Sequence, residues 1–343
     1  MVYAQSLIIR RAGSTQPVTT ANAVALAPMS GVTDLVFRRI AARLGTGLVV
    51  SEMVASGELI TGKAEARLRM EGEGIRPHAV QLAGRDPAWM AEAARLAEAS
   101  GADVVDINMG CPAKKVTGGY SGAALLKDLD LARRMIAATV AAVAVPVTLK
   151  LRLGWDDGAI VAPELARSAE ALGVALITVH GRTRAQFYNG RADWDAIRDV
   201  VEAVTVPVIA NGDVTTFDDA AEILRRSGAA GVMVGRGAQG RAWFPGHLAR
   251  FLATGERPAP PSLPAQLALA LEHYEGLLGL YGEAVGVRHA RKHLDWYMEA
   301  AARTAGVDVL PEARRALMTA TEPKAASQAL SDAFDAIGWR AAA

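Results

Sequence analysis

The sequence predicts an α/β protein in which a closed (β/α)8 TIM barrel is followed by a small all-helical C-terminal domain. Three observations predict this fold. Eight short apolar runs recur along the chain, amphipathic helical patterns separate several of them, and a proline-rich break precedes a stretch with helical patterns only. Runs that are apolar throughout are typical of parallel strands buried on both faces. Eight β–α units within ~230 residues fit a closed barrel with right-handed crossovers.

The elements follow one another in a regular order. The expected strands are Val24–Ala27, Leu48–Glu52, Ala79–Leu82, Val104–Asn108, Val147–Lys150, Ile177–His180, Val208–Asn211 and Val232–Gly235. The expected helices are Thr33–Leu44, Ala88–Ala99, Asp130–Ala142, Asp193–Val204 and Phe217–Arg226. Asp86 followed by Pro87 is a typical helix start. An open doubly wound sheet is the alternative, but it needs a glycine loop after the first strand, where this chain has Pro28 and Met29.

The domain boundaries follow from composition. The barrel is expected over residues 1–254, and the proline-rich residues 255–264 are expected to form a stiff linker. Residues 265–343 show helical patterns and no convincing strand, so they are expected to form the helical domain.

Composition excludes several classes of protein. One cysteine among 343 residues excludes an intrachain disulfide and favours a reducing compartment. A net charge of +1 excludes a globally polycationic nucleic-acid binder, although not a local basic patch. No apolar run approaches the ~18 residues of a membrane span, and the first residues lack the pattern of a secretory signal. We therefore expect a soluble cytoplasmic protein, without a membrane partner and as a monomer.

Polar side chains gather at the ends of the expected strands. Barrel enzymes place their reacting groups at the carboxyl ends of the strands. Seven expected strands end on or just before a polar, charged or thioether side chain, and the eighth ends on Gly235 followed by Arg236. The seven are Met29, Glu52, Gln81, Asn108, Lys150, His180 and Asn211. Polar residues are ordinary near solvent, but this set at one mouth predicts a binding site.

The last two strand ends indicate an anion site. Asn211-Gly212-Asp213 follows the seventh strand and leads into a helix near Thr216, and glycines flank Arg236 after the eighth. Such loops in barrels often hold a phosphate on backbone N–H groups. Tight turns are the other interpretation. A mononucleotide phosphate is favoured over a dinucleotide, because the G-x-G-x-x-G at 235–240 is not part of a βαβ unit.

Lys150 and Arg152 point to the same side of the fifth strand if its pleat continues. Two neighbouring cations repel each other unless an anionic or electron-rich group lies between them. A flavin ring that takes up electrons is such a group. Two solvated bases at a strand end are the alternative interpretation.

Cys111 lies directly after the fourth strand, in a glycine-containing stretch from Gly110 to Gly122. A thiol on a mobile loop at the mouth of a barrel can act as a nucleophile or as a proton donor. A lone cysteine is also often a small buried hydrophobic residue.

Basic residues recur at helical spacing in the C-terminal region, which suits the phosphates of RNA. They are Arg288, Arg291 and Lys292, beside Trp296 and Tyr297. Residues 258–343 as a whole hold 8 Lys and Arg against 10 Asp and Glu, so the basic face is local and a solvated helix face is the alternative. His289 and His293 lie four residues apart, but no third ligand is evident, so no metal is expected.

Nine segments in one order resemble the tRNA-dihydrouridine synthases, most closely the bacterial B-type branch. They are APMSGVTD (27–34), SEMV (51–54), VQLAGRDP (80–87), DINMGCPAKKV (106–116), KLRLGW (150–155), VHGRTRAQFYNG (179–190), IANGDV (209–214), VMVGRGAQGRAW (232–243) and ARKHLDWY (290–297). Two positions depart from the expected pattern, because Tyr120 and Leu153 stand where smaller residues are expected.

The resemblance implies an FMN-dependent oxidoreductase that reduces the C5–C6 double bond of uridine in the tRNA D-loop, with NADPH as the reductant. It implies Cys111 as the general acid, and it makes Asn108 and Arg152 candidates for orienting uracil. The residues that it implies for FMN are Ala27, Pro28, Met29, Gln81, Lys150, His180, Asn211, Gly212, Asp213, Gly235 and Arg236. The basic residues Arg288, Arg291 and Lys292 would grip the tRNA, from which the uridine must be flipped out.

Two other functions stay open at this point. One is a small-molecule FMN barrel enzyme similar to the dihydroorotate dehydrogenases, which would not need residues 265–340. The other is a non-catalytic RNA-binding or regulatory protein on a barrel scaffold, which would take up no FMN.

Overall fold

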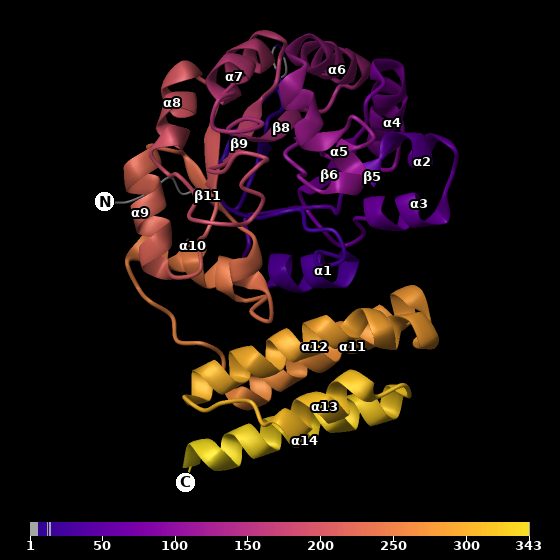
Figure 1. The fold of residues 1–343 in the computed structure, drawn as a ribbon, viewed down its shortest axis with the longest axis vertical. Coiled ribbons are helices and arrows are strands. Elements are labelled where there is room, and N and C mark those ends of the chain that lie inside the picture. Colours follow the sequence, from indigo (N-terminus) through magenta and orange to yellow (C-terminus); the bar gives the residue numbers. More distant parts are fainter. Residues whose placement is uncertain (1–5, 12, 14, 343) are drawn as a thin grey trace. The chain divides into compact units, whose positions relative to one another are not determined.

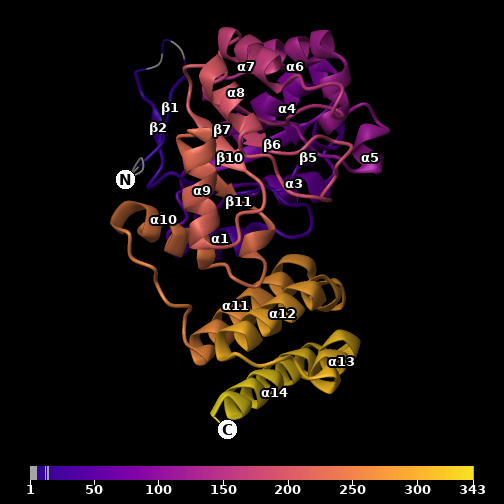
Figure 2. The same ribbon diagram turned by 60° about the vertical axis from the view of Figure 1, so that its left-hand side comes forward.

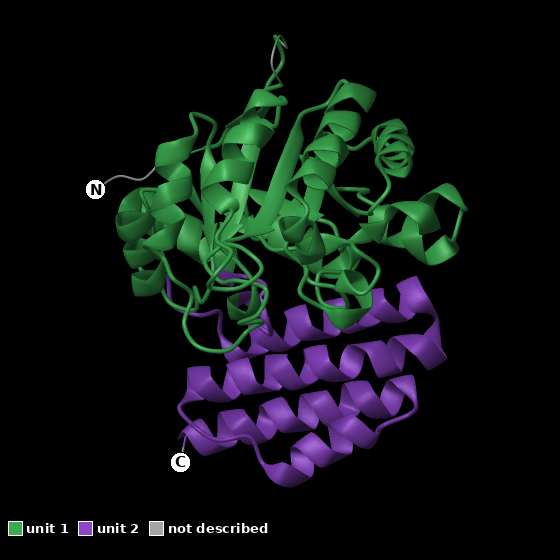
Figure 3. Cartoon of the chain, turned by 45° about the horizontal axis from the view of Figure 1, so that its top comes forward, with its two compact units in different colours: residues 1–237, 245–257 green, residues 238–244, 258–343 purple. Residues whose placement is uncertain are grey.

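The computed structural model describes residues 6–11, 13 and 15–342. The chain forms two compact units (Figure 3). Unit 1 comprises Met1–Gly237 and Pro245–Arg257, and unit 2 comprises Ala238–Phe244 and Pro258–Ala343. Among the residues described, no helix is both long and apolar enough to cross a lipid bilayer.

Unit 1 is a closed barrel of eight parallel strands (Figure 1). They are β3 (Val24–Leu26), β4 (Leu48–Val50), β6 (His78–Ala83), β7 (Val104–Met109), β8 (Val147–Arg152), β9 (Leu176–His180), β10 (Val208–Asn211) and β11 (Gly231–Val234). Each strand pairs with the next, and β11 pairs with β3, which closes the ring. The predicted fold class is confirmed, and all eight expected strands are present with ends displaced by at most two residues. A short strand, β5 (Val54–Ala55), lies beside β6.

An antiparallel hairpin closes the amino-terminal end of the barrel. It consists of β1 (Ile8–Ile9) and β2 (Val18–Thr19). Leu7 and Ile9 are fully buried in one apolar cluster with Leu48 and Val104, the first residues of β4 and β7. Figure 2 shows the hairpin at the left and helix α5 (Lys114–Thr117), which follows β7, at the right. Strands of two residues carry no readable alternation, so the sequence did not predict this hairpin.

Helices surround the strands (Figures 1 and 2). They are α1 (Leu35–Arg43), α2 (Ser56–Ile60), α3 (Ala64–Met70), α4 (Pro87–Ala99), α6 (Leu129–Ala142), α7 (Ala162–Ala171), α8 (Ala196–Ala203), α9 (Phe217–Ser227) and α10 (Phe244–Thr254). The five helices expected from the sequence are present. Asp86 caps α4 as expected, because its carboxylate accepts from the N–H groups of Ala88 and Trp89. Helix α7 was not among the helices expected from the sequence.

Over its described residues, unit 2 contains four helices, which lie side by side in Figure 3. They are α11 (Leu263–Tyr281), α12 (Glu283–Ala305), α13 (Pro311–Thr319) and α14 (Pro323–Ala342). Residues 255–262 form neither helix nor strand. Residues 238–244 group with the helices although they precede the proline-rich segment. A Cβ at Gly240 would lie 2.1 Å from the Trp296 carbonyl oxygen, so a glycine is needed where this segment meets α12.

Candidate active site at the strand ends

The eight barrel strands run parallel, so their carboxyl ends meet at one rim. The structure brings the strand-end residues of the sequence analysis to this rim. Gln81 lies within β6, Asn108 and Lys150 lie near the ends of β7 and β8, and His180 and Asn211 end β9 and β10. The remaining members lie one to three residues after the end of a strand, and they are Ala27, Pro28, Met29, Glu52, Gly212, Asp213, Gly235 and Arg236.

A chain of buried polar side chains runs through the top of the barrel. Thr148 Oγ1 donates to Asp106 Oδ1 at 2.6 Å, and Gln81 Nε2 donates to Asp106 Oδ2 at 2.7 Å. Gln81 Oε1 in turn accepts from Asn108 Nδ2 at 2.7 Å. Burial raises the pKa of Asp106, while the hydrogen bonds from Thr148 and Gln81 act in the opposite direction. Asp106 was not predicted as a site residue, although a carboxylate inside an otherwise apolar strand was a readable signal.

The polar chain ends on the cysteine loop. Asn108 Oδ1 accepts from the backbone N–H groups of Gly110 and Cys111 at 3.1 and 2.9 Å. The Cys111 carbonyl oxygen accepts from the N–H of Ala123, and a Cβ on Gly122 would lie 2.9 Å from that oxygen. Gly122 has φ +60°, so glycine suits this position for two reasons. Cys111 is a free thiol that is neither fully buried nor fully exposed, held at both ends of its backbone.

Lys150 is a cation in unfavourable surroundings. Its Nζ donates to Asn211 Oδ1 at 3.2 Å, and Asn211 Nδ2 donates to the carbonyl oxygen of Met233. Burial, and then the nearby charge of Arg152, lower the pKa of Lys150 to about 8. The two cations therefore lie close together, as the two-residue spacing in the strand suggested.

Arg152 uses its hydrogen-bond donors on backbone carbonyl groups. Its Nε donates to the Gly110 carbonyl oxygen at 2.9 Å, and its Nη1 donates to the carbonyl oxygens of Thr183 and Phe187 at 2.9 and 2.7 Å. The side chain is 2% exposed, and burial lowers its pKa to about 10. Arg152 thus fastens the cysteine loop to the loop after β9. Its expected contact with uracil stays a prediction.

An ion pair that the sequence did not predict joins the loops after β9 and β10, with Arg182 buried and Asp213 partly exposed. Arg182 donates to Asp213 through two bonds of 2.9 and 2.6 Å, and Arg236 reaches the same carboxylate at 3.4 Å. Asp213 also accepts from the N–H of Ala192. Its carboxylate is thus occupied by protein groups and shapes the loop rather than projecting freely. The signal was available, because Arg182 is two residues beyond the strand-end histidine.

Arg182 also selects the tautomer of His180. Its Nη1 lies 3.3 Å from His180 Nε2. A guanidinium only donates, so Nε2 accepts and the ring proton is on Nδ1. Burial, followed by the charges of Lys150, Arg152, Arg182 and Arg236, lowers the pKa of His180 well below its ordinary value. A neutral ring with an Nδ1–H donor is the result.

The loops after β10 and β11 are closely packed. Gly212 has φ +132°, and a Cβ there would lie 2.6 Å from the Ala192 Cβ. A Cβ at Gly237 would lie 2.2 Å from the Val214 carbonyl oxygen. The N-terminus of α9 is capped internally, because Thr216 and Asp219 accept from each other's backbone N–H groups. The anion expected here would therefore depend on Arg236 and the loop backbones more than on α9.

The three basic residues of α12 differ in their surroundings. Arg291 Nη2 donates to the Ala320 carbonyl oxygen at 3.0 Å, which ties α12 to the segment before α14. Arg288 is exposed and Lys292 is partly exposed. The rings of His289 and His293 have different neighbours, since His289 stacks on Tyr281 whereas His293 lies edge-on to Trp296 and His273.

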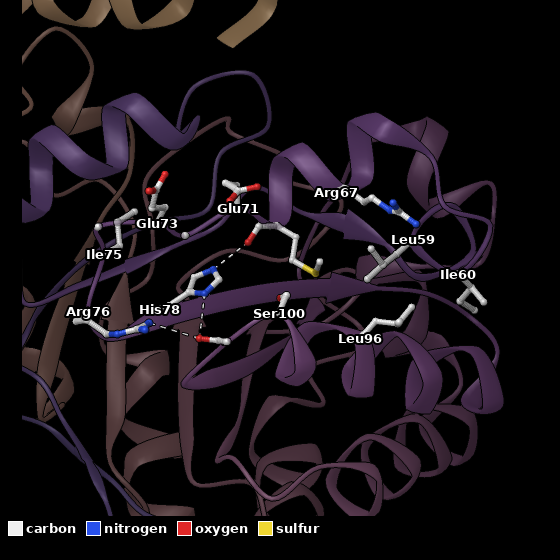
Figure 4. A pocket seen from close by; sticks show the side chains of 14 residues that line it. Leu59, Ile60, Arg67, Glu71, Glu73, Ile75, Arg76, His78, Leu96 and Ser100 are labelled. Carbon is white, nitrogen blue, oxygen red and sulfur yellow. Dashed lines mark hydrogen bonds between the residues drawn. The ribbon is translucent and has the colours of Figure 1, made fainter. Parts of the chain in front are cut away.

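A cavity of about 690 Å³ lies elsewhere in unit 1, between α2, α3 and α4 (Figure 4). His78, at the start of β6, faces it, and its two ring nitrogens lie 2.9 and 3.4 Å from the carbonyl oxygens of Met70 and Gly101. Burial lowers the pKa of His78. None of the strand-end residues lines this cavity, so the cavity and the rim of the barrel are separate places in unit 1.

Comparison with known proteins gives one family. Residues 25–337 match the model of the dihydrouridine synthase (Dus) family. The chain is 57% identical over 316 residues to a "Probable tRNA-dihydrouridine synthase" of Rhizobium leguminosarum bv. phaseoli, covering 92% of this chain and 96% of that protein. It is 46% identical over 323 residues to "tRNA-dihydrouridine synthase B" of Xanthomonas axonopodis pv. citri (strain 306), covering 94% and 95%.

A solved structure supports the fold alone. Histamine dehydrogenase from Rhizobium sp. 4-9 superposes with a TM-score of 0.54 at 13% identity. The alignment covers 78% of this chain and spans about half, 50%, of the length of that structure. On the family model and the two relatives, the chain belongs to the dihydrouridine synthase family.

Proposed function

We propose that this chain is an FMN-dependent tRNA-dihydrouridine synthase that reduces the C5–C6 double bond of a uridine in the tRNA D-loop, with NADPH as the reductant. Family membership and the printed names of the relatives support the reaction and the tRNA substrate. The proposal describes a monomeric enzyme of the cytoplasm. It adds the cofactor, the reductant, the D-loop and the proton donor to what family membership provides.

The residues at the strand ends fit an FMN. Lys150 carries a charge that burial destabilises, and an electron-rich ring beside it would relieve this cost. A Cβ on Gly235 would lie 3.8 Å from both the Ala27 Cβ and the Met29 Sδ, so its absence leaves space between the ends of β3 and β11. Arg236 is half exposed and can supply a charge-assisted contact to a phosphate.

Each FMN residue has a role in this assignment. Ala27, Pro28, Met29, Gln81 and Lys150 would contact the ring, and His180, Asn211, Gly212, Asp213, Gly235 and Arg236 would hold the ring edge, the ribityl chain and the phosphate. His180 would do so through its Nδ1–H. Asp213 would act indirectly, because it orients Arg236 and the loop that carries Gly212.

The reaction adds a hydride and a proton across one double bond. Reduced FMN, when bound, supplies the hydride that adds to C6 of uracil. The Cys111 thiol then donates its proton to C5 from the opposite face of the pyrimidine. Asn108 holds the Cys111 backbone and donates one amide N–H to Gln81, so its second amide N–H is the group that would donate to a uracil oxygen. Arg152 keeps the cysteine loop seated by its bond to the Gly110 carbonyl oxygen, and its contact with uracil is part of the same proposal.

The observation that carries the proposal is that Cys111, with its backbone held at both ends, lies at the same rim as the two neighbouring cations Lys150 and Arg152. A uridine within folded tRNA cannot enter this rim, so it must be extruded from its stack. We assign the grip on the tRNA backbone to the helical unit, through Arg288 and Lys292. Arg291, which the sequence grouped with them, has a bond within the unit and would act mainly by keeping α12 in place.

The test is a direct assay of the product. Purified protein, FMN, NADPH and a tRNA transcribed without modifications are incubated, and dihydrouridine is measured by nuclease digestion and mass spectrometry. The expected result is a yellow protein that forms dihydrouridine in the D-loop and requires NADPH. A protein that binds no flavin, or that consumes NADPH without altering the tRNA, would disprove the proposal.

A further inference from the structure

Two exposed aromatic residues near the mouth have strained backbones. In the part of the chain that the structure describes, the residues other than glycine with positive φ are Tyr120, Phe187 and Asp213. Tyr120 has φ +58° and is 69% exposed, and Phe187 has φ +54° and is 38% exposed. Bulky side chains avoid this region of φ and ψ, and such strain clusters at sites that bind ligands. The ion pairs of Asp213 account for its conformation, whereas Tyr120 is largely in solvent and Phe187 is partly in solvent.

The two residues occupy equivalent places in linked turns. The Tyr120 N–H donates to the Thr117 carbonyl oxygen at 3.0 Å, and the Phe187 N–H donates to the Arg184 carbonyl oxygen at 3.1 Å. The first residues of these turns are themselves joined, since Arg184 Nη2 donates to Thr117 Oγ1 at 3.4 Å. One inter-loop contact therefore joins the turn that carries Tyr120, on the cysteine loop, to the turn that carries Phe187, on the loop after β9.

The surrounding structure holds this conformation rather than relaxing it. The Phe187 carbonyl oxygen accepts from the buried guanidinium of Arg152 at 2.7 Å. The N–H of Ser121, the residue after Tyr120, donates to the Val116 carbonyl oxygen at 3.2 Å. The ring centroids of Phe187 and Tyr188 lie 5.0 Å apart with the ring planes nearly perpendicular, and Phe187 is 38% exposed. For Tyr120, burial of the ring offsets little of the strain, so contact with a binding partner is the stabilisation that would favour an aromatic residue at this position.

The charge of the neighbourhood selects the kind of partner. Lys114 and Lys115, on the same loop as Tyr120, are both exposed. Arg184 lies with its guanidinium 4.7 Å from the centre of the Trp155 ring. Aromatic rings beside cations are the combination with which proteins bind single-stranded nucleic acid, since bases stack on the rings and phosphates meet the cations.

We propose that Tyr120 and Phe187 form a stacking platform for the unpaired bases that flank the target uridine in the RNA. This inference rests on the proposed function and deepens it. The platform would help to hold the uridine outside its stack, and it would bias the enzyme toward uridines whose neighbours can also unstack. Tyr120 stands where the resemblance led us to expect a smaller residue, so this contact is a specificity element of this chain.

The test exploits the strain. Asparagine tolerates positive φ, so Tyr120→Asn should leave the melting temperature equal or higher, and it should weaken tRNA binding roughly 5-fold to 100-fold. Tyr120→Phe keeps a ring and should bind nearly as the wild type does. Phe187→Asn serves as the second variant. Affinity is measured by filter binding of unmodified tRNA transcripts, with KM and kcat for dihydrouridine formation alongside.

The salt dependence of tRNA binding separates a stacking contribution from a charge contribution. Lys115→Ala removes a phosphate contact, so its defect should shrink as salt rises, because fewer counterions are released on binding. The defect of Tyr120→Asn should stay nearly constant from low to high salt, because stacking releases no counterions.

The outcomes also separate this inference from the proposed function. Wild-type protein that fails to bind tRNA would overturn both. Wild-type protein that binds and reduces tRNA, while Tyr120→Asn and Phe187→Asn behave identically to it, would overturn the platform alone. A defect in tRNA binding that vanishes at high salt would overturn the platform as well, because stacking should not depend on salt. A melting temperature that falls together with the affinity would also overturn it, because replacing a strained aromatic residue by asparagine should not destabilise the fold.

Discussion

Replacing Lys150 by Met should stabilise the flavin-free protein, although it removes a residue that we assign to the cofactor. Burial and Arg152 lower the pKa of Lys150 from 10.5 to about 8. A fall of this size corresponds to about 3 kcal/mol of destabilisation at pH 7, when the lysine is charged in both folded and unfolded states. The variant also loses the bond to Asn211, which contributes about 1 kcal/mol. The expected net gain is therefore about 2 kcal/mol.

The pH dependence follows from the direction of the pKa shift. Below pH 8 the lysine is protonated in both states, so its destabilising effect is complete. Between pH 8 and 10.5 the folded protein binds fewer protons than the unfolded chain, and the stability of the wild type rises. The advantage of Lys150→Met should therefore be lost by pH 10.5.

Urea unfolding of flavin-free protein at pH 7 and pH 10.5, followed by circular dichroism, measures both differences. Lys63→Met is the matched control, because Lys63 is exposed and its pair with Glu58 is solvated, so a change within ~0.5 kcal/mol is expected. FMN affinity of Lys150→Met should fall, since the cation is then missing from the ring site. A variant that is less stable at pH 7, or equally favoured at both pH values, would refute the reasoning.

Three further changes test the assignments separately. Cys111→Ala should slow dihydrouridine formation ~100-fold or more while the protein keeps its flavin, and a rate equal to the wild type would remove the proton-donor role. Arg236→Ala should weaken retention of FMN during gel filtration, and unchanged retention would count against the phosphate contact. Arg288→Glu combined with Lys292→Glu should raise KM for tRNA and reduce its salt dependence without shifting the melting temperature. Unchanged tRNA kinetics would mean that α12 does not touch the RNA.

Local patterns predicted the barrel well, because each strand contains a short apolar run and the polar residues toward the strand ends stand out against it. The hairpin that closes the barrel escaped notice, because Ile8–Ile9 and Val18–Thr19 are too short to show a period. The position of the polar residues at one rim then followed from parallel strands alone.

The hydrogen-bond partners of the charged side chains could not be predicted from the sequence. Arg152 and Arg291 were grouped with binding residues because of their charge and spacing. The structure shows that both donate to backbone carbonyl oxygens, Arg152 in two separate loops and Arg291 in the segment before α14. Whether a guanidinium faces a ligand or a carbonyl depends on contacts 29 or more residues away, which no local period encodes.

The buried carboxylate of Asp106 gives the polar chain a direction. Both carboxyl oxygens of Asp106 accept, one from Thr148 and one from Gln81, so Gln81 turns its NH2 toward Asp106 and its oxygen toward Asn108. Because its NH2 faces Gln81, Asn108 turns its oxygen toward the backbone N–H groups of Gly110 and Cys111. Asp106→Asn, a change of one atom, would permit both amides to reverse and present NH2 where Cys111 needs an acceptor. The orientation of the Asn108 amide, and with it the hold on the Cys111 backbone, thus depends on the buried carboxyl group of Asp106.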